Sequence, residues 1–313
     1  TEVAPLVRTG GSRHTGLAAL PHRNIQRYIQ VKLTKSIELK RHIKPILTIF
    51  ANSVATTIYV NADTTMIGLL SGDYYVGLYA LAVKIYNVIK TMLAAIYSVA
   101  IPRISFLVGQ NDKEKIKQVF TSVCTALTII LLPAAIGLAA ISREVVIIMG
   151  GTEYLDSVLT LQILSLSLIG AVFGGLFTYC LNIPLGREKI NVKATTISAL
   201  VNVGLNIIVI PIFKHNGAAF TTVVAEFFVL LYCWLSCKDL KDYLDISAFK
   251  KSLFQSFVGC MTILIVSFLV KCYCNGILAI VVLVIVLSII LYALELIFLK
   301  NEIVMKLLQK LRR

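Results

Sequence analysis

Residues 276–299 read GILAIVVLVIVLSIILYALELIFL, a stretch in which Glu295 is the only charged side chain. As a helix it would be about 36 Å long, which is enough to cross the roughly 30 Å hydrocarbon core of a bilayer. A helix also satisfies its own backbone hydrogen bonds in lipid, where water is absent. The stretch therefore predicts a transmembrane helix.

Similar apolar stretches recur towards the N-terminus, separated by turn residues such as Asn275-Gly276. The predicted spans are 45–70, 75–100, 118–141, 157–181, 191–213, 217–237, 253–271 and 276–299. Of the 313 residues, 58% are hydrophobic and only 15% are charged, whereas about a quarter of a soluble domain is charged. We therefore predict an all-α, polytopic membrane helix bundle with about eight transmembrane helices. The composition argues against a soluble enzyme.

The chain has a net charge of +14, and its basic residues are distributed unevenly among the connections between the predicted spans. Of the 30 Lys and Arg residues, 25 lie at the termini and in every second connection, whereas the alternate connections hold three. Basic residues favour the cytoplasmic side of a membrane, so both termini are predicted to be cytoplasmic. This topology explains the basic excess, and no nucleic-acid partner is expected.

Ionisable side chains within the spans indicate a polar pathway, because charge is costly at membrane depth. They are Asp63, Lys84, Lys90, Glu226 and Glu295. At about 100° per residue, polar residues form stripes on four helices. The stripes comprise Thr48, Asn52, Thr56, Tyr59 and Asp63; Tyr79, Tyr86, Lys90 and Tyr97; Asn191, Thr195, Ser198, Asn202 and Asn206; and Thr222 and Glu226. They predict either a hydrophilic lumen between helices or hydrogen bonds inside a packed bundle.

Each ionisable group has a candidate role. Lys90 lies near mid-membrane on a tyrosine-lined face, which favours it for attracting an anionic substrate group. Asp63 and Lys84 lie at similar depth on either side of a tight hairpin, so we predict either an ion pair or separate roles. Glu226 is a candidate for binding a proton or a coupling ion. Glu295 lies close to the cytoplasmic end of its helix, where its carboxylate is expected to snorkel to the interface.

Small residues predict one close contact between helices, at Gly170 and Gly174. The spacing of four residues places both glycines on one face of a helix, where a neighbouring backbone can approach.

The connections are too short for a catalytic domain outside the membrane. The seven cysteines lie mostly in apolar runs and the histidines are scattered, so neither a metal nor a cofactor is predicted. A membrane-embedded glycosyltransferase, polymerase or acyltransferase is an alternative, but it needs catalytic groups on outer loops. Those loops offer only scattered residues, namely Asp73, Arg143, Glu144, Glu153 and Asp156. We therefore expect a transporter and no enzyme.

Residues 42–86, HIKPILTIFANSVATTIYVNADTTMIGLLSGDYYVGLYALAVKIY, resemble the mid-protein signature of Wzx-type flippases for O-antigen or capsule repeat units. That family belongs to the multidrug/oligosaccharidyl-lipid/polysaccharide exporter superfamily. The matching elements are the Tyr59-to-Asp63 stretch, Met66-Ile67-Gly68, Val76-Gly77-x-Tyr79 and Ala82-x-Lys84, followed by YCLNIPLG at 179–186, the Asn202…Asn206…Pro211 run and Gly217-Ala218-Ala219…Glu226. The resemblance covers about residues 30–300.

The resemblance implies a place in a larger architecture. The family has about fourteen helices in two six-helix lobes plus two trailing helices, and the eight predicted spans correspond to helices seven to fourteen. Residues 1–44 are then a basic cytoplasmic segment, of which 1–24 are expected to be disordered or non-native. Residues 45–237 form the six-helix second lobe, and residues 238–313 form two trailing transmembrane helices and a basic cytoplasmic tail. A non-functional or partner-dependent fragment is an alternative.

The resemblance also implies a function in a bacterial inner membrane: movement of undecaprenyl-pyrophosphate-linked oligosaccharide repeat units across the membrane by alternating access. The implied substrate-binding residues are Lys84, Lys90, Tyr86, Tyr97, Asn52, Tyr59 and Asn202. Asp63 and Glu226 are the implied ion-coupling residues, for a proton or a sodium ion. Membrane lipids, a polysaccharide polymerase and chain-length machinery are the expected partners. A multidrug or cation exporter, or a lipid II flippase, of the same superfamily is an alternative.

Overall fold

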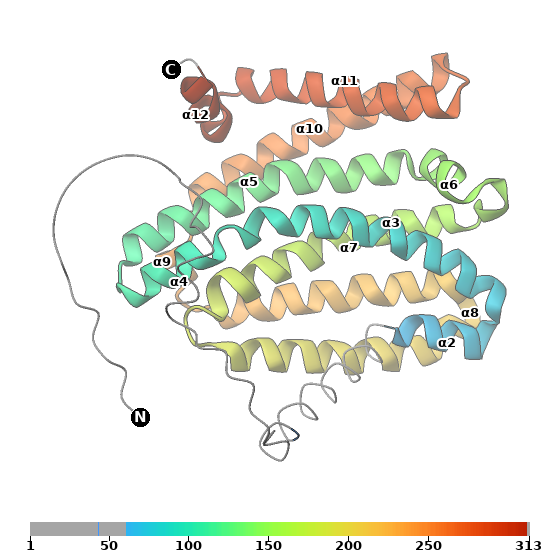
Figure 1. Ribbon diagram of the computed structural model, residues 1–313, viewed down its shortest axis with the longest axis horizontal. Coiled ribbons are helices and arrows are strands. Elements are labelled where there is room, and N and C mark those ends of the chain that lie inside the picture. Colours follow the sequence, from blue (N-terminus) through green and yellow to red (C-terminus); the bar gives the residue numbers. More distant parts are fainter. Residues whose placement is uncertain (1–42, 44–60, 312–313) are drawn as a thin grey trace, which may run out of the picture. The chain divides into compact units, whose positions relative to one another are not determined.

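The computed structural model describes residue 43 and residues 61–311 (Figure 1). Every regular element within this part of the chain is helical. In chain order these elements are α2 (Ala62–Ser71), α3 (Asp73–Ser98), α4 (Ile101–Gly109), α5 (Lys113–Ala140), α6 (Ser142–Gly150), η2 (Thr152–Tyr154), α7 (Ser157–Leu176), η3 (Phe177–Asn182), α8 (Glu188–Ser236), α9 (Leu240–Tyr243), α10 (Ile246–Tyr273), α11 (Ile277–Phe298) and α12 (Glu302–Leu311). Several are long and apolar enough to cross a membrane. The predicted all-α, polytopic bundle is confirmed.

Helix α8 is a hairpin of two antiparallel helices. A straight helix of its 49 residues would be about 73 Å long, more than twice the hydrocarbon thickness. The backbone instead leaves the helical conformation at Lys214, where φ is 53° and ψ is −134°. The Ser198 hydroxyl in the first half donates to the Ala225 carbonyl in the second half over 2.8 Å, so the two halves lie side by side. They match the predicted spans 191–213 and 217–237.

The structure has six candidate spans within the described residues, and because α8 is a hairpin they correspond to seven candidate crossings. Helix α2 is the last part of the predicted span 45–70, and the remainder of that span, residues 45–60, lies outside the described residues. The total of eight crossings and the cytoplasmic termini stay predictions.

The turn of the α8 hairpin is anchored to two neighbouring helices. His215 Nε2 lies 3.1 Å from the Asp156 carbonyl, and its ring stacks on Tyr75. The Thr160 hydroxyl donates to Asn216 Oδ1 over 2.7 Å. These contacts hold the reversal of the chain against α3, α7 and the residue before α7.

The predicted close helix contact is confirmed between α7 and the second half of α8. A Cβ atom added to Gly170 would lie 2.9 Å from the Glu226 carbonyl carbon, so only glycine allows this approach. Gly174 lies one turn further along, beside Leu230. The two glycines thereby set the distance between α7 and the helix that carries Glu226.

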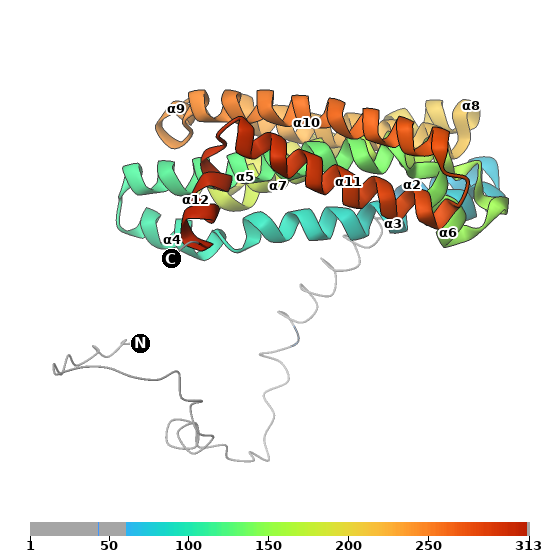
Figure 2. The ribbon, with the colours of Figure 1, turned by 90° about the horizontal axis from the view of Figure 1, so that it is seen from above.

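Helix α10 packs on α5 and on α11. Figure 2 shows α10 and α11 side by side, with α12 running crosswise beyond the C-terminal end of α11. The Asp245 carboxylate caps α10 by accepting from the backbone N–H groups of Ser247 and Ala248. The Lys271 ammonium, near the other end of α10, donates to Glu144 Oε2 over 2.9 Å and so links α10 to α6.

Candidate functional site

A polar face on α3 forms the first part of the site. Tyr79, Tyr86, Lys90 and Tyr97 lie on one side of α3, as the spacing predicts, and all three tyrosines are buried. They face α7 and α8: the Tyr86 hydroxyl lies 3.4 Å from Ser167 Oγ, and Gly175 leaves room for Tyr97. The polar stripes of α3 and α8 meet as contacts within a packed bundle.

The Asp63 carboxylate on α2 is the centre of the Asp63 cluster, which also comprises Tyr79, Thr222, Asn206 and Asn202. Its Oδ2 atom accepts from the Tyr79 hydroxyl over 3.0 Å and from the Thr222 hydroxyl over 2.9 Å. Its Oδ1 atom accepts from Asn206 Nδ2 over 2.6 Å. Among the described residues, no basic side chain pairs with Asp63.

The Asp63 cluster continues into the α8 hairpin. Asn206, which is fully buried, also donates from Nδ2 to Asn202 Oδ1 over 3.2 Å. Its Oδ1 atom accepts from the Thr221 hydroxyl, which belongs to the other half of the hairpin. A single carboxylate is therefore surrounded by hydroxyl and amide groups from three helices.

An ion pair lies further along the same helices. The Lys90 ammonium donates to Glu226 Oε1 over 2.8 Å, and it lies 5.4 Å from the centre of the Tyr86 ring. Two residues assigned to separate roles are therefore partners, and the positive charge of Lys90 is neutralised. Sequence spacing placed each residue on the correct face but did not reveal this pairing, because the two lie 136 positions apart.

The predicted Asp63–Lys84 ion pair is wrong. The oxygens of Asp63 accept from neutral groups, and Lys84 is exposed on a different side of α3. The rotation between the two positions explains this outcome, because residue 84 lies about 140° around the helix from Tyr79, the α3 residue that reaches Asp63.

Lys84 lines an open groove of about 740 Å³ on the surface of α2 and α3. Asn61, Thr64, Asn87 and Thr91 contribute its polar lining. The groove therefore combines one ammonium group with amide and hydroxyl groups, which is a suitable lining for a ligand that carries phosphate and sugar groups.

Three further residues were predicted to bind substrate, namely Tyr97, Asn52 and Tyr59. Tyr97 stacks on Tyr179 with ring centres 6.2 Å apart, and its backbone carbonyl accepts from the Cys180 thiol. Asn52 and Tyr59 lie outside the described residues. Their roles, like those of the other predicted site residues, stay predictions.

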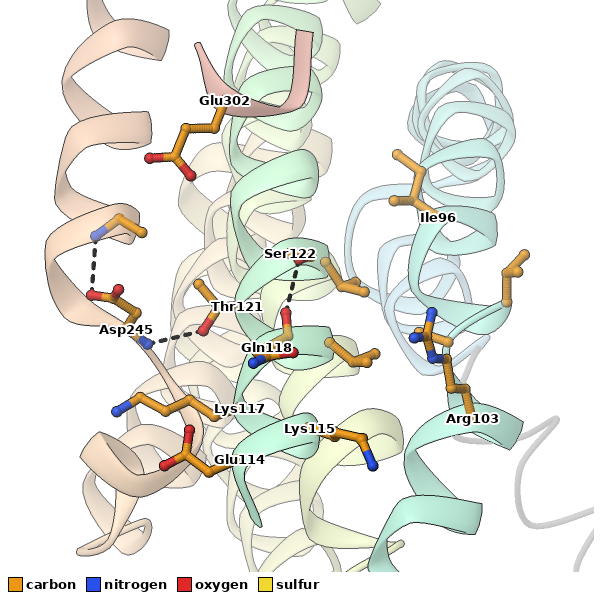
Figure 3. Close-up of a pocket in the computed structure, with 15 residues that line it drawn as sticks. Ile96, Arg103, Glu114, Lys115, Lys117, Gln118, Thr121, Ser122, Asp245 and Glu302 are labelled. Atoms are coloured by element: carbon orange, nitrogen blue, oxygen red, sulfur yellow. Dashed lines mark hydrogen bonds between the residues drawn. The ribbon is translucent and has the colours of Figure 1, made fainter. Parts of the chain in front are cut away.

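A second cavity of about 880 Å³ lies where α3, α4, α5, α10 and α12 come together (Figure 3). Its basic lining residues, Arg103, Lys115 and Lys117, are matched by Glu114, Asp245 and Glu302. Because these charges balance, the lining offers no preference for an anionic or a cationic ligand.

An ion pair that sequence reasoning missed lies near the predicted cytoplasmic end. Arg187, before α8, donates to both carboxylate oxygens of Asp239, before α9, over 2.7 and 2.5 Å. The Arg187 guanidinium holds the pKa of the Asp239 carboxyl below its usual range through these hydrogen bonds. The pair joins the two ends of the α8 hairpin, and local sequence held no signal for it because the partners lie 52 positions apart.

Comparisons with known proteins agree with this architecture. The family described as "Polysaccharide biosynthesis protein" matches residues 26–159. The probable low-salt glycan biosynthesis flippase Agl15 of Haloferax volcanii is 26% identical over 178 residues, covering 56% of this chain and 37% of that protein. An uncharacterized membrane protein of Methanocaldococcus jannaschii is 28% identical over 219 residues, covering 66% of this chain and 42% of that protein.

The structure of the lipid II flippase MurJ, in an inward closed conformation, matches with a TM-score of 0.71 at 19% identity. The match covers 89% of this chain and 59% of that one. The chain therefore has the fold of part of that flippase and spans less than two thirds of the length of these relatives. The predicted resemblance to glycan flippases is confirmed as a similarity, and the chain is a multi-pass membrane protein.

Proposed function

We propose that this chain is part of an ion-coupled flippase that moves undecaprenyl-pyrophosphate-linked oligosaccharides across the cytoplasmic membrane for surface polysaccharide assembly. The support is threefold: a fold shared with a lipid II flippase, similarity to a probable glycan flippase, and a match to a polysaccharide biosynthesis family. Transport by alternating access needs two conformations whose relative stability depends on bound ligands. The residues described above supply a candidate for each ligand.

The observation that carries the ion coupling is the Asp63 carboxylate, which is partly buried within a membrane bundle and has no basic partner among the described residues. A carboxylate in such a place is costly unless a cation or hydrogen bonds compensate its charge. Three neutral donors compensate it in this conformation. A bound monovalent cation would compensate it more fully.

The donor set fits a hard cation such as Na⁺, which prefers oxygen ligands. The carboxylate of Asp63, the hydroxyl oxygen of Thr222 and the amide oxygens of Asn206 and Asn202 are the groups that would hold it. The Thr222 hydroxyl can turn its hydrogen away, and an Asn amide can rotate to present oxygen in place of nitrogen. Both changes need little movement of the backbone.

The Asp63 cluster joins α2 to both halves of the α8 hairpin. A cation there would strengthen the contact between these helices, and its release would leave that contact to neutral hydrogen bonds. Ion binding and helix arrangement would thereby be linked, because a ligand shifts a conformational equilibrium by its difference in affinity for the two states. We prefer this role for Asp63 over Glu226, whose charge Lys90 already neutralises.

For the substrate, the structure favours Lys84 over Lys90. Lys84 is exposed in the α2–α3 groove, whereas Lys90 is engaged with Glu226. We infer that the pyrophosphate binds near Lys84 and that the sugars contact the amide and hydroxyl groups beside it. Tyr86 and Tyr97 then act by supporting the helices, and Asn202 acts in the Asp63 cluster. The positive charge in this groove argues against a lipophilic cation as the substrate.

The test is complementation. The whole gene that encodes this chain is expressed in a strain that lacks its glycan flippase but makes the matched repeat unit. We expect surface polysaccharide to return with the wild-type protein, to be lost with Asp63→Asn and to be retained with Asp73→Asn, a matched change at an exposed position. No rescue by well-expressed wild-type protein would contradict the flippase function. Full rescue by Asp63→Asn would contradict the ion-coupling role alone.

The substrate of a lipid II flippase carries the same pyrophosphate and carrier lipid as the proposed substrate, so the α2–α3 groove would also suit that substrate. Rescue of a strain that lacks its lipid II flippase, without rescue of surface polysaccharide, would favour that alternative.

A further inference from the structure

Helix α12 separates apolar from polar residues around its axis. At about 100° per residue, its apolar positions fall within one arc and its polar positions within the opposite arc. The apolar arc contains Ile303, Val304, Leu307, Leu308 and Leu311, and the polar arc contains Glu302, Lys306, Gln309 and Lys310. Ile303 and Val304 are partly buried in the structure. Glu302 and Gln309 are exposed, so the described side chains follow this division.

Two buried amides fix the turn that leads from α11 into α12. Lys300 has a φ of 48°, which ends α11 and redirects the chain. Asn301, only 3% exposed, caps α12 by accepting at Oδ1 from two backbone N–H groups of its first turn. Gln255 on α10 donates to the Leu299 carbonyl and accepts from Asn301. The direction of α12 is therefore determined by its attachment to the end of the α10–α11 pair.

This turn places α12 across the end of a helix that is long enough to cross a membrane. Helix α11 has 22 residues and so is about 33 Å long, which matches a hydrocarbon core of about 30 Å. Helix α12 follows closely after it and runs crosswise (Figure 2). A helix in this position lies along the boundary between hydrocarbon and water, where an amphipathic helix is most stable.

The charge around α12 complements an anionic lipid surface. Residues 300–313 contain five basic residues and one acidic residue, Glu302. The Glu302 carboxylate lies 3.9 Å from Nζ of Lys251 on α10, so its charge is engaged with the bundle. Basic residues beside a bilayer are attracted to anionic lipid headgroups. The apolar arc would suit any lipid, whereas the basic residues favour an anionic one.

We propose that α12 is a membrane-interface helix that binds anionic lipid headgroups on the side of the bilayer where α11 ends. Its apolar arc contacts the outer part of the acyl chains, and the basic residues of its polar arc contact headgroup phosphates. Because Gln255 and Asn301 join α12 to α10, this contact also holds the end of the α10–α11 pair at the membrane surface. The proposal is independent of the proposed function.

The test measures the surroundings of a spin label on α12 in the purified protein in vesicles. Val304→Cys labels the apolar arc and Gln309→Cys labels the polar arc, in a background in which Cys272 and Cys274 are replaced by serine. In phosphatidylcholine vesicles with about 30% phosphatidylglycerol, an anionic lipid, the Val304 label should collide more with oxygen, which dissolves in lipid, than with a water-soluble nickel complex. The Gln309 label should show the reverse order. A Val304 label that collides mainly with nickel would place α12 in water, and one shielded from both would place it against protein; either result would overturn the proposal.

A second set of measurements tests the choice of lipid. Lys306→Gln/Lys310→Gln should abolish the excess of oxygen collisions at the Val304 label in the anionic vesicles. The matched control is Lys189→Gln/Lys193→Gln, which removes two exposed lysines at the same spacing near the start of α8 and should have no effect. Without either change, the excess should also fall in high salt and in vesicles of phosphatidylcholine alone. An excess that does not depend on lipid charge, on salt or on the two α12 lysines would overturn the binding of anionic headgroups.

Discussion

The contribution of the Lys90–Glu226 ion pair to the stability of the bundle can be measured with a double-mutant cycle. The ammonium and the carboxylate lie 2.8 Å apart, on α3 and on the second half of α8. Glu226→Gln leaves Lys90 without its counter-ion, and Lys90→Met leaves Glu226 without one. The double variant removes both charges and leaves groups of similar size.

The expected loss of unfolding free energy depends on how deeply the Lys90–Glu226 pair is buried. Removing one partner of a fully buried pair costs about 3–5 kcal/mol, whereas exposed pairs contribute about 0–1 kcal/mol. The Lys90 and Glu226 side chains keep 35% and 25% of their surface exposed, so this pair lies between these limits. We expect each single variant to lose about 2 kcal/mol and the coupling energy to be about 1–2 kcal/mol, so that the double variant is more stable than the singles predict.

The assay is equilibrium unfolding in mixed micelles, followed by the helical circular dichroism signal as denaturing detergent increases. The matched control is the Asp112–Lys115 pair at the start of α5, in which the Lys115 side chain is 63% exposed. Its coupling energy should not exceed about 0.5 kcal/mol. Equal coupling energies for the two pairs, or none for Lys90–Glu226, would refute the reasoning that burial makes this pair strong.

Three further predictions concern packing, pH and substrate. Gly170→Ala should lose about 1–3 kcal/mol in the same unfolding assay, because its Cβ would meet the Glu226 backbone, whereas Gly77→Ala, with open space around it, should not destabilise the protein. Because the folded-state pKa of Asp239 lies below its usual range, the stability from its ion pair is present at neutral pH and is lost as pH falls through that folded pKa. Asp239→Asn should therefore flatten the acid limb of the unfolding curve, and an unchanged limb would contradict the contribution of this pair. Lys84→Gln should weaken binding of a pyrophosphate-linked glycan about tenfold or more in a fluorescence titration, with Lys84→Arg close to wild type; equal affinities would exclude the lysine from the site.

The sequence predicted the fold class well because a membrane imposes strong rules on it. Span 276–299 is confirmed as α11 to within a residue or two at each end, since lipid requires a continuous apolar helix. Helical spacing also placed Tyr79, Tyr86, Lys90 and Tyr97 correctly on one face. These are local properties, determined by composition and by the geometry of one helix.

The pairing of charges could not be predicted in the same way. Whether Lys90 meets Glu226 or Lys84 meets Asp63 depends on how helices far apart in the sequence rotate and pack. Glu295 illustrates the same limit: its distance from the helix end indicated an interfacial position, but the packing of α11 on α10 brought it to Thr262. Helix α12 was also missed, because its charged residues were interpreted only as a basic tail.

The most direct test of the account is the effect of Na⁺ on the stability of the purified chain, measured against choline at constant ionic strength. At a Na⁺ concentration about 100 times Kd, binding to the folded state should raise the unfolding free energy by about 2.7 kcal/mol. We predict this gain for the wild type and for Asp73→Asn, and no gain for Asp63→Asn. An equal gain in all three proteins, or no gain in the wild type, would contradict a cation site at Asp63.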